Sequence, residues 1–505
     1  MHNKYFVNDK NHSNLNLLEE SLKMGVEYKN REKVINYADD SEISSIVSEQ
    51  FPEESTDLER LISEFESNIL PYSTNFSSPN FMAFPDSGNS VASHAANILS
   101  GFMNQNLINS THCSPIATYI ELQTIQWLRE LMGYSFEDIR NISDITDSGG
   151  IALTGGTLAN TVGLLLARES LFVNAKNTGL NNKVKDVRVI MPEGIDHYSI
   201  RVAMGWLGLG EDNILYVKTN GNYTIDQIDL KEKIEKYKNK YKFIALIAYA
   251  GDSRTMAIDD FNKLYTIAKE HNIWFHVDAC QGFVAKFSNT LKAGLDGIEL
   301  ADSIALDPHK VMWLPYNLSY LLVKNPEQLK KVIGGSDLIN KEAMSFGQMT
   351  PFLGSKAFDS LKLYFVLKNL GSKKIGELVD YRYDLASYFA EKIDSENCFV
   401  RINEVTVNSV VFVYKPEEEI ENIDAFNTLQ KSIHQRLWQE GDQYLHTFTL
   451  HDPSQKLSSD KSVKWQMLRL FIGNPLTEES NINRLMSNVK KIAEEEYSKL
   501  FVENL

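Results

Sequence analysis

The hydrophobic and polar residues of this chain follow two periods, one typical of helices and one typical of buried strands. In residues 56–70 and 114–134 the apolar side chains recur at helical spacing, which predicts two helices that each bury one face. From residue 149 onwards, short apolar runs alternate with helical stretches. The runs predicted as strands are 187–191, 214–218, 243–250, 273–277 and 302–307. This alternation indicates an α/β fold with a mostly parallel sheet covered on both faces.

A second, smaller group of strands is predicted near the C-terminus. The runs concerned are 398–402, 408–414, 446–450 and 465–475, with helices near 424–439 and 477–499. They indicate a separate α+β domain. Residues 1–55, in contrast, are polar with only short apolar groups, so we expect an arm that packs on another surface. The chain is therefore predicted to have three parts: a helical arm and dimer clasp over 1–110, a large domain over 111–385 and a small domain over 386–505.

Composition narrows the classes of function. A chain of 505 residues that is 43% hydrophobic can bury more than one core. Its net charge of −16 argues against nucleic acid and anionic membranes as partners. Cys113, Cys280 and Cys398 lack metal-ligand spacing, so we expect reduced thiols, a cytoplasmic protein and no metal site. No stretch approaches the roughly 20 apolar residues that cross a bilayer, and we expect no signal peptide.

Residues suited to binding a phosphate and a ring follow the predicted strands. Gly155, Gly156 and Thr157 open an apolar helix, whose free amides and hydroxyl suit a phosphate, although a glycine turn also serves tight packing. Asp278 ends a strand and would suit a protonated ring nitrogen, unless it is a loop acid or helix cap. His197 lies where a strand meets a helix, and it either stacks on a planar ring or caps that helix.

Lys310 follows the strand 302–307 directly. Low-dielectric surroundings lower the pKa of a lysine and free its amine for imine formation, whereas the commoner fate of a lysine is a solvated surface position. Each of these features is ambiguous alone. Together they supply the parts of a pyridoxal 5′-phosphate (PLP) site: a phosphate cradle, a ring-stacking group, an acid for the ring nitrogen and an imine-forming lysine.

The chain resembles the group II PLP-dependent decarboxylases, the family of glutamate and aromatic-L-amino-acid decarboxylases. The likeness runs from about Ser78 to Pro475. The matching segments are NFMAFPDSGNS, SPIATYIELQTIQWLRELMGY, TGGTLANTVGLLLAR, DHYSIRVAMGWLGLG, HVDAC, ADSIALDPHK, GSKAFDSLKLYFVLKNLG and LRLFIGNP. The resemblance implies a type I, aminotransferase-like fold with a mixed, mostly parallel sheet and a smaller C-terminal domain. It also implies PLP as the cofactor, decarboxylation of an L-amino acid to an amine and CO2, and a homodimer with shared active sites.

The resemblance also implies roles for single residues. Lys310 matches the lysine that holds the cofactor as an imine, and His309 matches a residue near the phosphate. Gly156 and Thr157 fall on the phosphate-binding turn. Asp278 matches the acid on the ring nitrogen.

Three further residues complete this set. Ala279 matches the small residue that lies against the ring, and His197 matches the histidine stacked on the opposite face. Arg469 falls where glutamate decarboxylases place an arginine for the substrate's α-carboxylate. In this reading Lys310, His197 and Asp278 are the catalytic residues.

Several positions depart from the family pattern. A mobile loop of the family carries a tyrosine that protonates the reaction intermediate, but residues 325–350 contain no tyrosine, and Phe346 is their only aromatic residue. Because a phenylalanine at that tyrosine's place is associated in plant relatives with aldehyde formation, an oxidative decarboxylase or another carbon–carbon lyase stays the alternative. Asp252 and Arg254 add charge near the cofactor pocket.

The substrate is poorly specified by the sequence. In relatives, the segment equivalent to residues 84–87 lines the substrate pocket, and here it offers Asp86. This acid predicts a polar or cationic substrate side chain, whereas the alternative is that Asp86 is a helix N-cap. An aromatic or acidic substrate also stays open.

Overall fold

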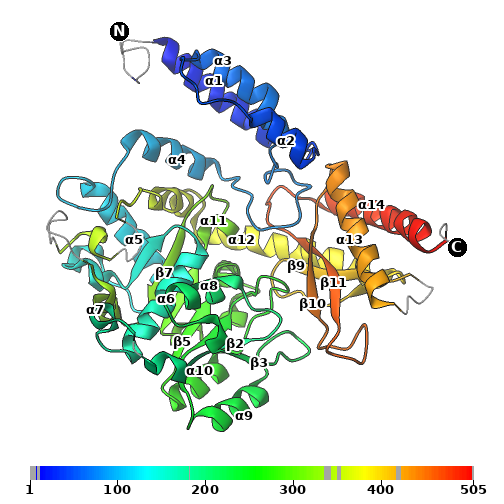
Figure 1. Cartoon of the computed structure of the whole chain (residues 1–505). Helices are drawn as coiled ribbons and strands as arrows, with labels where there is room; N and C mark the ends of the chain where they lie inside the picture. The colour runs from blue at the N-terminus through cyan, green and yellow to red at the C-terminus, as the bar shows by residue number, and fades with distance from the viewer. Residues whose placement is uncertain are drawn as a thin grey trace.

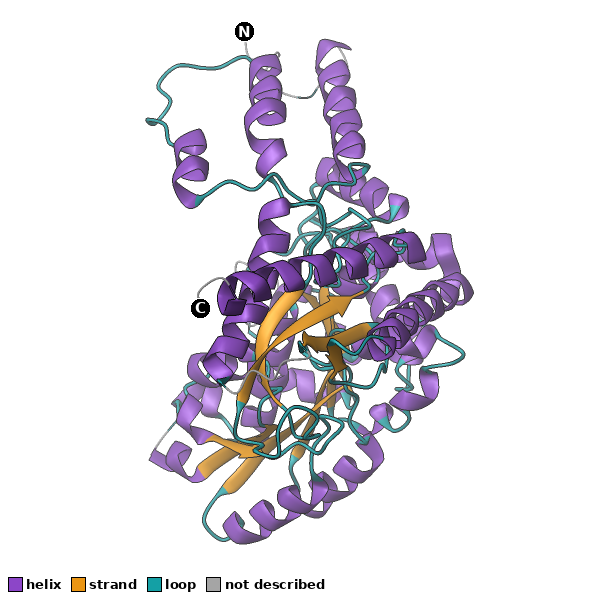
Figure 2. Ribbon diagram, turned by 90° about the vertical axis from the view of Figure 1, so that its right-hand side faces the viewer, coloured by secondary structure: helices purple, strands orange, loops and turns teal. Residues whose placement is uncertain are grey.

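The computed structural model describes residues 7, 12–180, 182–334, 343–349, 354–416 and 422–502. Two sheets with their own helices form the body of the molecule, and the N-terminal helices stand away from it (Figures 1 and 2).

The larger sheet has seven strands in the order β1-β7-β6-β5-β4-β2-β3. Their bounds are β1 Gly150–Leu153, β2 Val187–Pro192, β3 Ile214–Val217, β4 Lys242–Tyr249, β5 Trp274–Asp278, β6 Ser303–Leu306 and β7 Ser319–Val323. The neighbours from β3 to β6 pair in parallel, whereas β7 runs antiparallel to both β6 and β1. The predicted mixed, mostly parallel sheet is therefore confirmed. The strands β1 and β7 were not predicted.

The strands of this sheet are buried on both faces because helices cover the sheet on either side, as in other parallel sheets. The helices around it are α4 Val91–Met103, α5 Pro115–Leu131, α6 Gly156–Leu171, α7 Ala175–Thr178, α8 Tyr198–Trp206, α9 Gln227–Tyr237, α10 Phe261–Glu270 and α11 Pro308–Val311. In the register of the sheet, Asp278 at the end of β5 pairs with Tyr249 on β4 and Ala305 on β6. Side chains at these carboxyl ends therefore meet at one edge, where open α/β sheets bind ligands.

The smaller sheet is antiparallel, with the order β10-β11-β9-β8. Its strands are β8 Phe399–Arg401, β9 Ser409–Tyr414, β10 His446–His451 and β11 Lys464–Phe471, and its helices are α13 Ile423–Glu440 and α14 Glu479–Tyr497. The long helix α12, Ser360–Ser395, runs from the large part of the molecule to this sheet and kinks at Gly371, where φ is 68°. The domain boundaries at residues 110 and 385 stay predictions.

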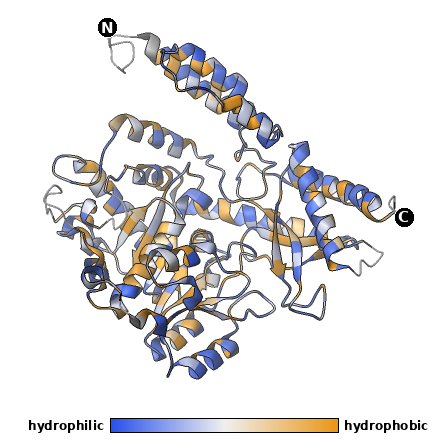
Figure 3. Ribbon diagram, viewed as in Figure 1, coloured by the Kyte–Doolittle hydropathy of each residue, from blue (hydrophilic) through white to orange (hydrophobic). Residues whose placement is uncertain are grey.

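The N-terminal helices α1 His12–Lys29, α2 Asp40–Val47 and α3 Leu58–Glu64 carry exposed apolar side chains. Leu22 on α1 is 52% exposed and Leu61 on α3 is 47% exposed. Figure 3 shows apolar and polar residues mixed along these helices, whereas the strands of the larger sheet are mainly apolar. Within the described part of the chain, no helix is both long enough and apolar enough to span a membrane.

Candidate active site

Lys310 lies on the short helix α11, which begins directly after β6. Its ammonium nitrogen Nζ is 2.8 Å from Oδ2 of Asp307, a fully buried carboxylate. The other oxygen of Asp307, Oδ1, accepts a hydrogen bond of 2.5 Å from the hydroxyl of Ser319 on β7. The solvated-surface alternative is thus excluded by the geometry, because the lysine side chain is only 21% exposed.

The electrostatics of Lys310 differ from the sequence-based expectation of a lowered pKa. Burial by itself lowers the pKa of Lys310, but the negative charge of Asp307, followed by the electrostatic effects of Cys280 and Asp86, raises it above the ordinary value for lysine. The pKa of Asp307 is lowered: burial raises it, and the charges of Lys310 and His309 more than reverse that effect. The expectation of a lowered pKa was wrong because it considered only the low dielectric around Lys310. It overlooked Asp307, the acid three residues earlier in the chain.

A glycine turn faces this ion pair from the start of α6. A Cβ atom placed on Gly156 would lie 2.5 Å from Oδ2 of Asp307 and 2.7 Å from the sulfur of Cys280, so no side chain fits there. Gly155 has a φ of +104°, which residues other than glycine rarely adopt. The packing role and the phosphate role that the sequence left open are therefore compatible. The free amides at the start of α6 open on the side of Lys310, and the predicted contact of Thr157 with a phosphate stays a prediction.

Asp278 ends β5 beside the same hollow and is 6% exposed. Its Oδ2 accepts a hydrogen bond of 2.8 Å from the amide of Asn160 on α6, and its Oδ1 accepts one of 3.1 Å from the backbone N–H of Cys280. Among the described residues, no lysine or arginine forms an ion pair with this carboxylate. A buried acid without a cation is costly, so the site favours a protonated group placed against Asp278.

Asn160 links Asp278 to a buried histidine. Its side-chain oxygen lies 2.9 Å from Nε2 of His276, and Nδ1 of His276 lies 2.7 Å from the hydroxyl of Ser303. Burial lowers the pKa of His276 to about 4, although Asp278 partly opposes this effect. The ring is therefore neutral at pH 7. Asn160 lies within the glycine-rich segment that resembles the family, but the resemblance implies no role for it.

His197 is the N-cap of α8 and also lines the hollow at Lys310. Its Nδ1 is 2.7 Å from the hydroxyl of Ser199 and accepts a hydrogen bond of 3.3 Å from the Ser199 N–H. Its own backbone N–H donates to the hydroxyl of Tyr249 at 3.0 Å. Burial lowers the pKa of His197, with Asp278 acting in the opposite direction. The helix-cap and ring-stacking interpretations are therefore compatible, since the cap fixes the imidazole at the site.

Two further predicted residues lie beside this group. His309 is buried next to Lys310, with Nδ1 2.8 Å from the backbone oxygen of Leu318 and its ring 5.1 Å from that of Tyr316. Ala279 is fully buried between Asp278 and Cys280. Their predicted contacts with the phosphate and the ring stay predictions.

Arg469 reaches the region from β11 of the smaller sheet. Its guanidinium is buried and donates to the backbone oxygen of Ser253, a residue that lines the hollow, and to that of Ala83 at 2.9 Å. Its Nε has no hydrogen-bond partner. Burial lowers the pKa of Arg469 to about 10, which leaves it cationic at pH 7. Arg469 is thus a fixed positive charge, and its Nε–H group is available to donate one further hydrogen bond.

The structure contradicts the N-cap alternative for Asp86. The N-cap of α4 is Ser90, whose side chain accepts from the N–H of Ser93. Asp86 instead lies within the electrostatic reach of Lys310, and its buried Oδ1 has no hydrogen-bond partner.

The loop that was expected to carry a catalytic aromatic residue is only partly described. Residues 335–342 and 350–353 lie outside the described ranges. Phe346 is fully buried, with the ammonium of Lys356 5.7 Å from its ring centre, and it does not line the hollow at Lys310.

The charged residues of the loop after β4 have mainly a structural role. Asp252 is fully buried and accepts hydrogen bonds from the backbone N–H groups of Arg254, Thr255 and Ala257 within its own loop. Arg254 donates to the backbone oxygen of Asp196 at 2.8 Å, next to His197. The extra charge at this loop therefore holds backbone in place.

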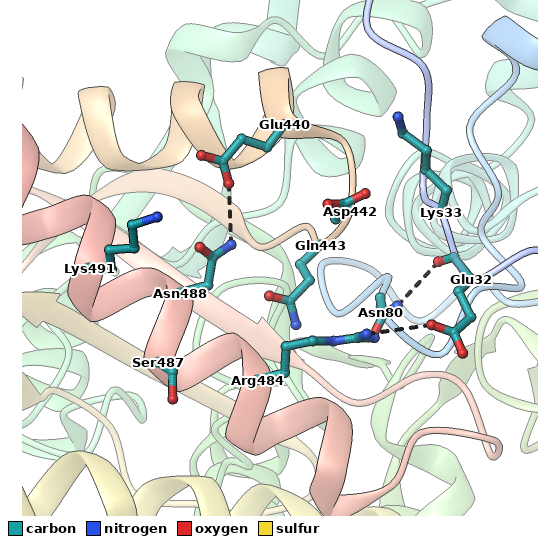
Figure 4. A pocket seen from close by; sticks show the side chains of 10 residues that line it. All are labelled: Glu32, Lys33, Asn80, Glu440, Asp442, Gln443, Arg484, Ser487, Asn488 and Lys491. Atoms are coloured by element: carbon teal, nitrogen blue, oxygen red, sulfur yellow. Dashed lines mark hydrogen bonds and ion pairs between the residues drawn. The ribbon is translucent and has the colours of Figure 1, made fainter.

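A larger hollow of about 550 Å³ lies elsewhere, between the N-terminal segment and α14 (Figure 4). Arg484 donates there to Asn80 at 2.7 Å and to Glu32 at 3.4 Å, and Asn488 donates to Glu440 at 3.4 Å. These polar groups satisfy one another. The hollow at Lys310 is smaller, but it holds the unpaired acid and the lysine, so the chemistry points there. In the described ranges, no three His, Cys, Asp or Glu residues gather as a metal site would require.

PLP fits the residues at Lys310. The glycine turn leaves room where any Cβ would collide, Asp278 is a buried acid without a cation, and Lys310 supplies a primary amine beside both.

Comparisons with known proteins agree with this reading. The family described as the pyridoxal-dependent decarboxylase conserved domain matches residues 41–415. The chain is 26% identical to an aromatic-L-amino-acid decarboxylase of Bacillus atrophaeus, with 92% of each chain covered. It is also 26% identical to an L-2,4-diaminobutyrate decarboxylase of Acinetobacter baumannii, covering 94% of this chain and 92% of the relative. A solved structure of Oryza sativa TDC with PLP and tryptamine superposes with a TM-score of 0.85 at 20% identity, covering 97% and 99% of the two chains.

The fold is that of the type I PLP-dependent enzymes. Within that class, the chain belongs to the pyridoxal-dependent decarboxylase family.

Proposed function

We propose that this protein converts an L-amino acid to the corresponding amine and CO2, with PLP held covalently by Lys310. The observation that carries the assignment is the convergence of Lys310, Asp278 and His197 on one hollow at the carboxyl ends of the strands. The bound cofactor supplies an electron sink for the negative charge that remains on the α-carbon when CO2 leaves.

The residues of the chain would each prepare the cofactor for this chemistry. Asp278 holds a proton on the ring nitrogen, because a buried carboxylate favours the cationic form of a group placed against it. His197 would contact one face of the ring and Ala279 the other. The amides at Gly156, the hydroxyl of Thr157 and the side chain of His309 bind the phosphate.

Lys310 has a second task besides holding the cofactor. Its amine must lose a proton before it can attack a carbonyl carbon. Asp307, which lies 2.8 Å from Nζ, favours the protonated form. We therefore propose that Asp307 holds the amine in its resting position and that Lys310 leaves this carboxylate when it reacts.

Arg469 is proposed to bind the α-carboxylate of the substrate. Its buried guanidinium keeps Nε without a partner, and a carboxylate is the natural acceptor for a desolvated arginine. The substrate's side chain is not set by family membership, since one relative is named for aromatic amino acids and another for L-2,4-diaminobutyrate.

We further propose that the protein is a cytoplasmic homodimer. Support for the cytoplasm comes from the free cysteines Cys113, Cys280 and Cys398. The dimer is supported by the exposed apolar side chains of α1 and α3, which gain from burial against a second copy.

The test is to incubate the purified protein with PLP and a panel of L-amino acids while CO2, amine and peroxide are measured together. We expect CO2 and amine in equal amounts. Aldehyde and peroxide in place of amine would show the oxidative alternative that the missing tyrosine in residues 325–350 keeps open. The absence of CO2 with every amino acid would refute the proposed function.

A further inference from the structure

Asp86 is a half-buried acid whose hydrogen bonding is incomplete. It lies in the segment before α4, and its Oδ1 is shielded from solvent without any partner. Burial raises the pKa of Asp86, and the nearby hydroxyl of Tyr316 partly opposes this effect. A carboxylate oxygen that is shielded from solvent and has no donor is poorly stabilised, so a donor or cation brought against it is strongly favoured.

The charged groups around Asp86 do not provide a donor or cation for its Oδ1. Lys310 has the strongest electrostatic effect on it, followed by His309, whereas Asp307 repels it. The ammonium of Lys310 is, however, bonded to Asp307 at 2.8 Å and leaves Oδ1 of Asp86 without a partner. Burial is accordingly the largest influence on the carboxyl of Asp86 and raises its pKa.

The backbone that carries Asp86 also touches Arg469. The backbone oxygen of Ala83 accepts from Nη2 of Arg469 at 2.9 Å. Ala83 and Asp86 are three residues apart, which limits the separation of their Cα atoms to about 11 Å, so both charges meet the same short segment. The ring of Phe84 lies between these positions in sequence and packs on His446 at 4.7 Å.

Beside Arg469 this segment packs on an uncharged ring, since His446 is the register partner of Arg469 on the neighbouring strand. Burial, followed by the charge of Arg469, lowers the pKa of His446 to about 3, so its ring carries no charge at pH 7. The segment therefore presents a cation at one end, two uncharged rings beside it and an anion at the other end. This pattern complements a molecule with a carboxylate at one end and an ammonium at the other.

We propose that Asp86, together with Tyr316, binds a terminal ammonium group on the substrate's side chain, so that the substrate is a cationic L-amino acid. This proposal rests on the proposed decarboxylase function and on Arg469 as the site for the α-carboxylate. A substrate with an acidic side chain would be repelled by Asp86, and a purely apolar one would leave its shielded carboxylate oxygen unpaired.

The test compares the PLP-loaded wild type with two variants, Asp86→Asn and Asp86→Glu. The substrates are L-2,4-diaminobutyrate, L-ornithine, L-lysine, L-glutamate, L-aspartate and L-tryptophan. We expect the highest wild-type kcat/KM with a cationic amino acid. Asp86→Asn should lower that kcat/KM by about 10- to 100-fold, mainly through KM, since an uncharged amide replaces a charge-assisted contact.

Asp86→Glu keeps the charge and should retain the preference for a cationic amino acid. Asp138→Asn is the matched control, because Asp138 is an exposed acid paired with Arg140 at 2.5 Å. The cofactor absorption band is recorded for each variant, so that a folding defect is separated from a loss of substrate affinity. If Asp86→Asn fails to bind the cofactor, Tyr316→Phe provides the second test and should raise KM for the cationic substrate by about 3- to 10-fold.

Two results would overturn the assignment of Asp86. One is a wild type that turns over L-glutamate, L-aspartate or L-tryptophan faster than every cationic amino acid. The other is an unchanged KM for the cationic substrate in Asp86→Asn. Both leave the decarboxylase function intact, whereas a wild type that releases no CO2 from any amino acid removes the function and the subsite together.

Discussion

Single residues decide how the buried acid Asp278 is oriented, and Asn160 is the one that the sequence motif leaves without a role. Its amide joins Asp278 to His276 through hydrogen bonds of 2.8 and 2.9 Å. Because His276 is buried and neutral, this chain fixes the orientation of the acid without adding a charge. Asn160 is thus a positioning residue for Asp278.

Replacing Asn160 by Ala should lower kcat by about 10-fold, as expected when one hydrogen bond to a charged group is lost. KM should change less, because the hydrogen bonds of this side chain are already made to Ser199, Asp278 and His276. The absorption band of the bound cofactor, followed as a function of pH, should also shift, which a purely structural defect would not produce. Asn222→Ala, at an exposed turn, is the control. Equal pH profiles for Asn160→Ala and the wild type would contradict the positioning role.

His276 makes stability depend on pH in a defined direction. Its pKa is about 4 in the folded protein and 6.5 when unfolded, so the unfolded chain binds a proton first as the pH falls. The free energy of unfolding should therefore be intact above pH 6.5 and decrease progressively between pH 6.5 and 4, by roughly 3 kcal/mol from this group. Denaturant unfolding at a series of pH values measures it. His276→Gln should flatten the curve in that interval, and an unchanged slope would be evidence against a neutral, buried His276.

At the scale of elements, packing tightly constrains the glycine turn between β1 and α6. A side chain on Gly156 collides with Asp307 and Cys280 at the floor of the site. The turn therefore brings the first amides of α6 close to Lys310.

Gly156→Ala should weaken cofactor binding and destabilise the fold by about 1–3 kcal/mol, because the added methyl overpacks a closed space. Gly205→Ala in α8 is a matched control, since its nearest neighbour is an oxygen of Glu211 at 3.9 Å. That change should be neutral or stabilising by about 1 kcal/mol, since alanine is the better helix former. Thermal unfolding with and without PLP measures both variants. Equal melting temperatures for the two would count against the tight turn.

The sequence predicts the central strands well because their apolar runs are long and bounded by polar loops. It fails at β1 and β7, which have four and five residues and follow a glycine-rich turn or a loop. These short strands are set by pairing with each other, a contact across about 170 residues that periodicity does not encode.

The same limit applies to the site. Lys310, Asp278 and His197 lie in recognisable motifs, and the structure brings them to one hollow. The raised pKa of Lys310 and the unpaired Asp86 depend on which charges meet in space, and Tyr316 comes to Asp86 through the fold. Neither follows from local sequence.

At the scale of the whole molecule, the projecting helices are the feature that a single chain does not explain. In Figures 1 and 2 the helices α1–α3 stand off the body, and apolar side chains on them remain exposed. Burial of apolar side chains stabilises an interface by about 25 cal/mol per Å² of buried area. A second copy that covers these side chains would therefore be bound stably.

Replacing Leu18 and Leu22 on α1 by Glu should therefore shift the protein from dimer to monomer. The two side chains are 41% and 52% exposed and lie one helical turn apart, so the charges would enter any interface formed there. Light scattering coupled to size exclusion measures the mass. Lys23→Glu, an exposed change on the same helix, is the control. A wild-type protein that is monomeric and fully active would contradict the dimer.

The central claim is that Lys310 holds PLP and that this attachment supports decarboxylation. The most direct measurement is the visible absorption spectrum of the PLP-loaded protein together with CO2 release, for the wild type, Lys310→Ala and the exposed-lysine control Lys324→Ala. We predict a yellow cofactor band and CO2 release for the wild type and the control. Lys310→Ala should lack the band and lose at least about 1,000-fold in rate. Wild-type absorption and CO2 release in Lys310→Ala would contradict the account.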